Sequence, residues 1–128
     1  MKILLAEDDP SIKTIAKLTL QKVGGHEVVT AENGQEAYEK ALDQKFDLVI
    51  LDYMMPIMDG LETCEKFKKN PAIRDIPIIF MTAKNQRSDI EAGFKMGALG
   101  YIVKPFDAQE LCNEIQKIYN KHLFGKAS

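Results

Sequence analysis

The sequence is short of the features that mark membrane, secreted or nucleic-acid-coating proteins. It has no tryptophan and two cysteines, Cys64 and Cys112, which fit neither a CxxC nor a zinc-ligand spacing. No apolar stretch approaches the roughly 20 residues of a transmembrane helix, and the start, MKILLAEDD, reaches acidic residues too soon for a signal peptide. With a net charge of -2 and no long block of one sign, we expect a cytoplasmic protein that binds neither nucleic acid nor membranes directly. Its cysteines are then expected to be buried, reduced thiols.

What the chain does contain is a regular alternation of two kinds of segment. Short apolar runs, typical of buried parallel strands, occupy residues 3–6, 27–31, 48–51, 76–81 and 99–103. A segment with helical spacing of apolar residues follows each run. This predicts one α/β domain, a single doubly wound five-stranded parallel sheet with five helices on its two faces. We place its one core in residues 1–124 and a short polar tail in residues 125–128.

The expected helices begin at capping residues. Three pairs give this signal: Asp9 with Pro10, Asp107 with Glu110, and Ser88 with Glu91, where a start of the helix before Ser88 is the alternative. Asp59, before Gly60, is interpreted as a turn or cap residue. Apolar spacing predicts that Ile15, Val23 and Leu42 are among the residues that face inward, and Met55 is interpreted as core packing.

The residues that follow the apolar runs form a second pattern. Glu7 and Asp8 come after the first run, Asp52 after the third, Thr82 after the fourth and Lys104 after the fifth. The carboxyl ends of parallel strands share one edge of a sheet, so we expect these side chains to converge. Grouped carboxylates repel each other, and a hard cation such as Mg²⁺ relieves that repulsion. With a lysine and a hydroxyl beside it, such a site can hold a phosphoryl group, and a carboxylate can accept it as an aspartyl phosphate.

Four stretches, in this order, resemble the receiver domain of bacterial two-component response regulators, chemotaxis regulators in particular. They are ILLAEDDPSI with its acid pair, LDYMMPIMDG around the acceptor, IIFMTAK and YIVKPF. Each is a weak signal alone, but four at the right spacings on the right strand ends are specific. The resemblance covers nearly the whole chain and implies a receiver domain in residues 1–124 with the flavodoxin-like strand order 2-1-3-4-5.

The resemblance implies a metal site and an acceptor. Asp52 corresponds to the phosphorylated aspartate of the family. Glu7 and Asp8 correspond to the acid pair that binds Mg²⁺, as Glu-Asp where many members have Asp-Asp, with Mn²⁺ as the alternative ion. The backbone carbonyl of Met54 corresponds to a further metal ligand.

The resemblance also implies a switch. Thr82 corresponds to the hydroxyl that moves toward the phosphoryl group, and Tyr101 to the aromatic side chain that follows it inward. Lys104 corresponds to the cation that pairs with the phosphoryl group, and Lys104-Pro105 to the family's cis peptide bond. Taken one at a time, these residues are more typical of a strand-end hydroxyl, a packing ring and a solvated lysine.

Activity and partners follow from the same resemblance. The family catalyses transfer of a phosphoryl group from a phospho-histidine donor to its own aspartate, so we expect self-phosphotransfer and self-dephosphorylation but no other enzyme activity. The expected donor is a sensor histidine kinase or a histidine phosphotransfer protein, which docks on the first helix and the loop after the fifth strand. The output is a shift of the face formed by the fourth helix, fifth strand and fifth helix, read by a downstream protein or a missing output domain.

Three alternatives differ in sequence features. An aspartyl-phosphate hydrolase usually has a second acid two residues after the nucleophile, where this chain has Met54. A flavin-binding module should carry a Ser/Thr/Gly-rich phosphate loop after the first strand, where this chain has three acids. A receiver that works unphosphorylated, as an interaction module, has usually lost site residues. Met54 and Lys84 occupy positions that influence water access in the family, and the apolar Met54 leads us to expect slow self-dephosphorylation.

Overall fold

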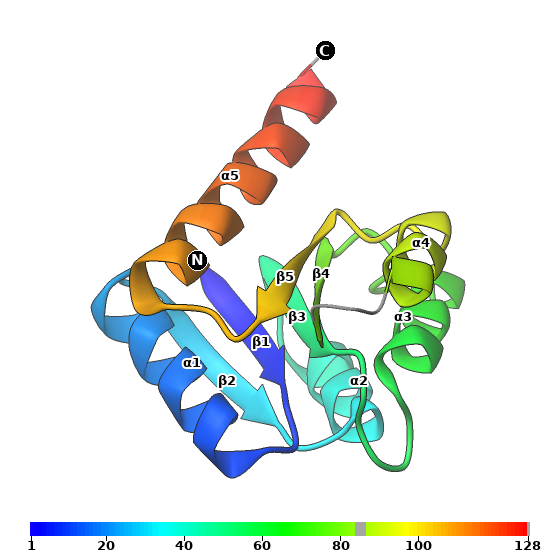
Figure 1. Ribbon diagram of the computed structural model, residues 1–128. Helices are drawn as coiled ribbons and strands as arrows, with labels where there is room; N and C mark the ends of the chain where they lie inside the picture. The colour runs from blue at the N-terminus through cyan, green and yellow to red at the C-terminus, as the bar shows by residue number, and fades with distance from the viewer. Residues whose placement is uncertain (84–86, 128) are drawn as a thin grey trace.

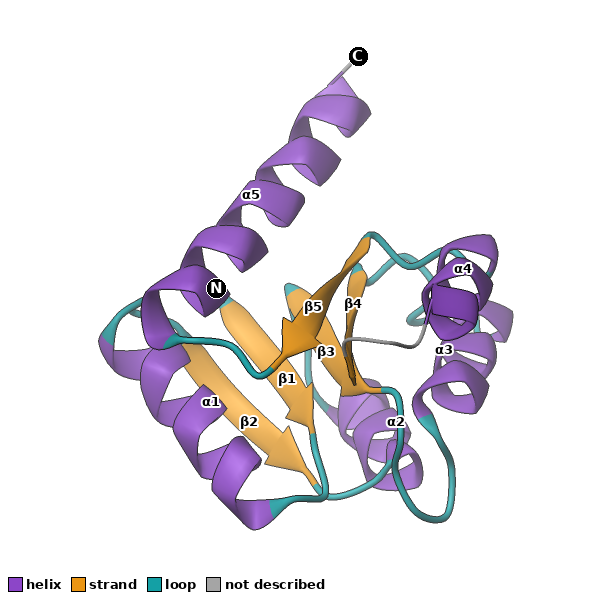
Figure 2. Cartoon of the chain, in the orientation of Figure 1, coloured by secondary structure: helices purple, strands orange, loops and turns teal. Residues whose placement is uncertain are grey.

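Five parallel strands in one sheet alternate with five helices (Figures 1 and 2). The computed structural model describes residues 1–83 and 87–127. The strands are β1 (Lys2–Ala6), β2 (Glu27–Ala31), β3 (Leu48–Asp52), β4 (Ile78–Ala83) and β5 (Gly100–Lys104). The helices are α1 (Pro10–Lys22), α2 (Gly34–Asp43), α3 (Gly60–Lys69), α4 (Arg87–Lys95) and α5 (Ala108–Ala127). The sheet order β2-β1-β3-β4-β5 confirms the flavodoxin-like α/β fold.

The sheet separates two apolar cores. Successive residues of a strand point to opposite faces. In β1, Ile3 and Leu5 pack with α1 and α5, whereas Leu4 and Ala6 pack with α2 and α3. The apolar residues of β3 repeat this alternation and are all buried. A strand covered on both faces needs apolar residues at every position, which is why its sequence reads as a continuous apolar run.

Side-chain caps start α1, α3 and α5 at the expected places. Asp9 accepts hydrogen bonds from two N–H groups of the first turn of α1, at 2.8 and 3.2 Å. Asp107 accepts one from the first turn of α5 at 2.8 Å. Asp59 forms a reciprocal capping box with Glu62 at the start of α3, which confirms its interpretation as a cap.

The structure decides between the two starts of the fourth helix and corrects one prediction about apolar faces. α4 already includes Arg87, so the helix begins before Ser88, as the alternative had it, and Ser88 does not cap it. Three residues expected to face inward are at least half exposed, at 58%, 51% and 50%: Ile15, Val23 and Leu42. The buried stripe of α1 is narrower than its apolar pattern, so Ile15 lies to one side of it. Val23 is the C-cap residue of α1, and Leu42 lies in the last turn of α2.

The sulfur-containing side chains Met55, Cys64 and Cys112 are buried, as expected. Met55 is 9% exposed and packs in the core with α2 and α3. Cys64 and Cys112 are buried free thiols. Burial raises the pKa of the Cys64 thiol to about 11, because an apolar environment disfavours the thiolate. Lys84, by contrast, lies outside the described residues.

The last helix continues beyond Phe124. Residues 125–127, which the sequence placed in a polar tail, lie within α5. Figure 1 shows the C-terminal part of α5 projecting away from the sheet, and there Leu123 and Phe124 are 48% and 75% exposed. Across the described residues, no helix has the length and apolar character needed to cross a membrane.

Candidate functional site

The strand register brings the polar residues together at the carboxyl edge of the sheet. Ala6 of β1 pairs with Leu51 of β3, so the next residue of each strand, Glu7 and Asp52, leaves the sheet beside the other. On the far side of β3, Asp52 pairs with Met81 of β4. Strand alternation places Asp52 on the face covered by α1 and α5.

Lys104 joins the two buried carboxylates. Its Nζ lies 2.9 Å from Oε1 of Glu7 and 3.0 Å from Oδ1 of Asp52. Glu7 is 0% and Asp52 4% exposed, so both charges are removed from bulk water. The second carboxylate oxygen of Glu7 accepts the backbone N–H of Asp9 at 3.3 Å. Residues 97 positions apart in sequence therefore form one ionic cluster, as the strand-end pattern predicted for Glu7, Asp52 and Lys104.

The pKa values in this cluster reflect burial and mutual charge. Burial is the main cause that raises the pKa of the Glu7 carboxyl, and the hydrogen bond and charge of Asp52 add to it, while Lys104 opposes the shift. Burial alone would lower the pKa of Lys104, but its hydrogen bonds and ion pairs with the two carboxylates outweigh that effect and raise it. Lys104 is therefore a permanent cation of the site at neutral pH.

Glu7 and Asp52 also form a cluster of carboxylate oxygens together with Asp8. One carboxylate oxygen from each of Glu7, Asp8 and Asp52 lies within 4.8 Å of the others. Asp8 is exposed, so the cluster opens to solvent at this residue. Mg²⁺ prefers oxygen ligands, with only a few carboxylates and several waters, and this set fits Mg²⁺ or Mn²⁺. Met54 follows two residues after Asp52 with a side chain that is 66% exposed.

The two switch candidates occupy different environments. Thr82 is 2% exposed near the end of β4. Tyr101, on β5, is 38% exposed and packs edge-on against Phe94 of α4, with ring centroids 5.9 Å apart. Tyr101 therefore has an outward orientation here, and Phe94 is its partner. The sequence offered no signal for Phe94, because Gly93 weakens the helical pattern of this segment. The Lys104-Pro105 bond is cis, as the resemblance implied.

The start of α3 packs directly on the backbone at the end of β3. A Cβ atom on Gly60 would lie 2.6 Å from the carbonyl oxygen of Asp52 and 2.9 Å from Cα of Tyr53. The N–H of Gly60 also donates to the carbonyl of Tyr53 at 2.9 Å. Gly60, which has no side chain, thus ends the turn after Asp52. Its close contact with the backbone holds the start of α3 against the site.

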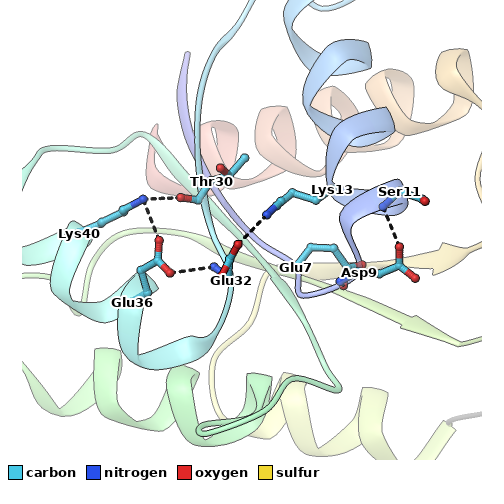
Figure 3. A network of polar contacts seen from close by, with 8 residues as sticks. All are labelled: Glu7, Asp9, Ser11, Lys13, Thr30, Glu32, Glu36 and Lys40. Atoms are coloured by element: carbon cyan, nitrogen blue, oxygen red, sulfur yellow. Dashed lines mark hydrogen bonds and ion pairs between the residues drawn. The ribbon is translucent and has the colours of Figure 1, made fainter.

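A chain of ion pairs and hydrogen bonds lies beside the acid cluster and ties α1 to α2 (Figure 3). Lys13 of α1 contacts Glu32 at 3.3 Å, and the N–H of Glu32 donates to Glu36 of α2 at 3.2 Å. Lys40 lies 3.0 Å from Glu36 and donates to the carbonyl of Thr30 at 2.6 Å. The hydrogen bond from Lys40 is the main cause that lowers the pKa of the Glu36 carboxyl. This network, which sequence reasoning missed, fixes the carboxyl end of β2 next to the acid cluster.

Comparison with known proteins identifies the family to which this chain belongs. Residues 3–116 match the sequence model of the response regulator receiver domain. The chain belongs to this family. Among curated relatives of this receiver domain, the alkaline phosphatase synthesis transcriptional regulatory protein PhoP of Bacillus subtilis is 36% identical over 120 residues, which cover 94% of this chain and 49% of PhoP. The response regulator ArlR of Staphylococcus aureus is 39% identical over 120 residues, covering 94% of this chain and 53% of ArlR.

Solved structures agree with the sequence comparison. The chemotaxis response regulator CheY4 of Vibrio cholerae is similar with a TM-score of 0.85 and 34% identity, covering 91% of this chain and 97% of CheY4. A response regulator receiver domain from Clostridium thermocellum is similar with a TM-score of 0.84 and 28% identity, covering 96% of this chain and 97% of that one. The chain spans about half the length of the curated relatives, which are response regulators and transcriptional regulators.

Proposed function

We propose that this receiver domain is a phosphorylation switch in which Asp52 accepts a phosphoryl group from a phospho-histidine donor. The observation that carries the proposal is the cluster in which Lys104 contacts both Glu7 and Asp52, while Asp8 completes a set of carboxylates open to solvent. A buried nucleophile, a fixed cation and a cation-binding rim are the parts that phosphoryl transfer to a carboxylate requires.

The transfer uses the chain's own residues in distinct roles. An oxygen of Asp52 attacks phosphorus, the P–N bond to the donor imidazole breaks, and its electron pair returns to the imidazole nitrogen. Lys104 exchanges its contact with Asp52 for a phosphoryl oxygen, and Thr82 donates its hydroxyl to another. Glu7, Asp8, Asp52 and the carbonyl of Met54 would hold Mg²⁺, which supplies positive charge to the phosphoryl oxygens.

The donor docks on an exposed apolar surface beside the site. Ile12 and Ile15 of α1 line a shallow cavity of about 380 Å³ together with Pro105, Phe106 and Lys104. Ile15 is 58% exposed, so this apolar surface is open to a partner. A histidine kinase or phosphotransfer protein bound there would present its phospho-histidine next to Lys104, in the cytoplasm where such donors act.

The output proceeds through the aromatic pair on α4 and β5. Phosphorylation draws Thr82 toward the phosphoryl group, which favours an inward orientation of Tyr101 and ends its contact with Phe94. The surface of α4, β5 and α5 then differs between the two states, as a population shift requires. A downstream protein or an output domain reads this difference.

Two other functions receive less support. An aspartyl-phosphate hydrolase would need a second acid at position 54, and the side chain there is an exposed methionine. An interaction module that works without phosphorylation needs no intact acid cluster, whereas the acids and Lys104 are together here.

Beryllofluoride, a mimic of the acyl phosphate, tests the proposal. With Mg²⁺ present, we expect it to shift the NMR resonances of Thr82 and Tyr101, because the adduct on Asp52 moves the switch. The Asp52→Asn variant should show no shift. Asp59→Asn is the matched control, since asparagine caps α3 as well as aspartate does, and it should respond like the original chain. Unchanged Thr82 and Tyr101 resonances in the original chain would contradict the proposal. They would favour an interaction module that works without phosphorylation.

A further inference from the structure

The ring of Phe80, on β4, lies between the loop that follows Asp52 and the helix α4. Phe80 is 3% exposed. Its ring packs against that of Tyr53, the residue after Asp52, with centroids 5.7 Å apart. The strand register pairs Phe80 with Tyr101 of β5, and paired residues of parallel strands point to the same face of the sheet. One buried ring therefore has neighbours at the end of β3 and on β5.

Two glycines face opposite edges of this ring. A Cβ atom on Gly93 of α4 would lie 2.7 Å from Cε2 and 2.8 Å from Cδ2 of Phe80. A Cβ atom on Gly60, at the start of α3, would lie 3.1 Å from Cε1 on the other edge. Because the ring is close to α3 on one edge and to α4 on the other, it cannot move away from one helix without approaching the other.

The contact with Phe80 accounts for a glycine inside α4. Glycine is a poor helix former, and the φ of Gly93 does not lie in the left-handed region, so the backbone conformation does not require glycine. The ring is what leaves no room for a Cβ atom there. Phe80 thus sets how closely α4 approaches the sheet. The next residue of α4, Phe94, is the one that packs against Tyr101.

We propose that Phe80 is a positioning residue that couples the loop after Asp52 to α4, by a route that does not pass through Thr82. The inference rests on the proposed function, and it adds a second way in which phosphorylation of Asp52 acts on α4. A displacement of Tyr53 or of the start of α3 moves the ring, and the ring moves Gly93. Coupling between two sites is reciprocal, so a change at Gly93 also affects the loop.

An added methyl group on α4 tests the coupling. Gly93→Ala pushes α4 away from Phe80 and weakens the contact by which Phe94 holds Tyr101 outward. The inward orientation is then favoured, so beryllofluoride with Mg²⁺ should bind about fivefold more tightly, as titrated by the Tyr101 resonances. Phe80→Leu makes room for the methyl group, so adding Gly93→Ala to this variant should leave Kd unchanged. A contact that is merely structural would lower the unfolding midpoint of Gly93→Ala and leave Kd as it was.

Phe80→Leu alone supplies a second readout, which needs no extra space in the core. When beryllofluoride binds this variant, the Thr82 resonances should shift as they do in the original chain. The Phe94 resonances should shift less, because the ring that moves α4 is gone. Phe94 shifts equal to those of the original chain would contradict the coupling even if Gly93→Ala does not fold.

A comparison without beryllofluoride separates this inference from the proposed function. Gly93→Ala should shift the Tyr53 resonances of the unmodified chain, and it should not shift them in the Phe80→Leu background. Glu91→Ala, at an exposed position of α4, is the control and should leave Tyr53 unchanged. An original chain that does not respond to beryllofluoride would contradict the proposed function, and the Tyr53 comparison would still decide the coupling. Tyr53 resonances that ignore Gly93→Ala, or that respond equally without the Phe80 ring, overturn it.

Discussion

Lys104 is the residue that connects Glu7 of the acid cluster with Asp52. It forms ion pairs with both Glu7 and Asp52, which are almost fully buried. The strand-end pattern was enough to place all three residues at one edge. It was not enough to show the contact of Lys104 with Glu7, because that contact depends on how far two side chains reach between β1 and β5.

Replacing Lys104 should therefore affect stability as well as activity. Lys104→Met leaves two buried carboxylates without their cation, and we expect the free energy of unfolding to fall by about 3 kcal/mol in the absence of divalent ions. Added Mg²⁺ should restore more stability to this variant than it gives to the original chain. Urea unfolding with and without Mg²⁺ measures both effects. Lys69→Met removes an exposed ion pair with Glu65 and should cost less than about 0.5 kcal/mol; equal losses in both variants would contradict the role of Lys104.

Met54 is expected to affect the lifetime of the aspartyl phosphate that we propose. Its exposed thioether cannot orient an attacking water by a strong hydrogen bond, so we expect slow hydrolysis of the aspartyl phosphate. Met54→Asn should shorten the half-life, measured as loss of the phosphorylated mass after the donor is removed. Met54→Leu is the apolar control and should keep the original half-life. An unchanged half-life in the asparagine variant would refute this role.

At the scale of elements, three caps were predictable because each depends on a few neighbouring residues. Asp9, Asp59 and Asp107 act at the positions read from the sequence. The exposure of Ile15 was not predictable, because it depends on which part of α1 the sheet covers. That misjudged residue belongs to the apolar surface on which we propose the donor docks.

The contact between α3 and the end of β3 predicts a costly glycine substitution. Alanine favours helices over glycine by up to about 1 kcal/mol, yet Gly60→Ala should lower the free energy of unfolding by about 2 kcal/mol. The added Cβ would meet the Asp52 carbonyl at 2.6 Å, and backbone cannot move aside as a flexible side chain can. Ser88→Ala, at an exposed position inside α4, is the control for propensity alone and should be neutral or slightly stabilising. Equal unfolding midpoints for the two variants would argue against a close contact at Gly60.

At the scale of the whole molecule, the sheet order came from the resemblance, whereas the α/β class came from periodicity. Strands that are buried on both faces appear in the sequence as continuous apolar runs, so β1 and β3 could be recognised without the resemblance. The contact of Phe80 with Gly60 and Gly93 could not, because it is formed by three elements whose relative positions no local pattern encodes.

Two buried thiols report on opening of the whole fold. The pKa of Cys64 is raised to about 11 by burial, and Cys112 donates to the Thr19 carbonyl at 3.7 Å. A raised thiol pKa means that little thiolate forms below that pH, so at pH 8 both cysteines should react with a disulfide reagent only as fast as the core opens. In denaturant both should react at once. An exposed reporter, Glu39→Cys, should react immediately in the native chain, and a native Cys64 that keeps pace with it would contradict a closed core.

The most direct measurement is the intact mass of the chain after incubation with Mg²⁺ and acetyl phosphate. We predict one added phosphoryl group, absent in Asp52→Asn and in the presence of EDTA, and retained in Asp59→Asn. This result would establish Asp52 as the acceptor and the acid cluster as a metal-dependent site. An adduct that persists in Asp52→Asn, or that forms equally well with EDTA, would contradict the proposed chemistry.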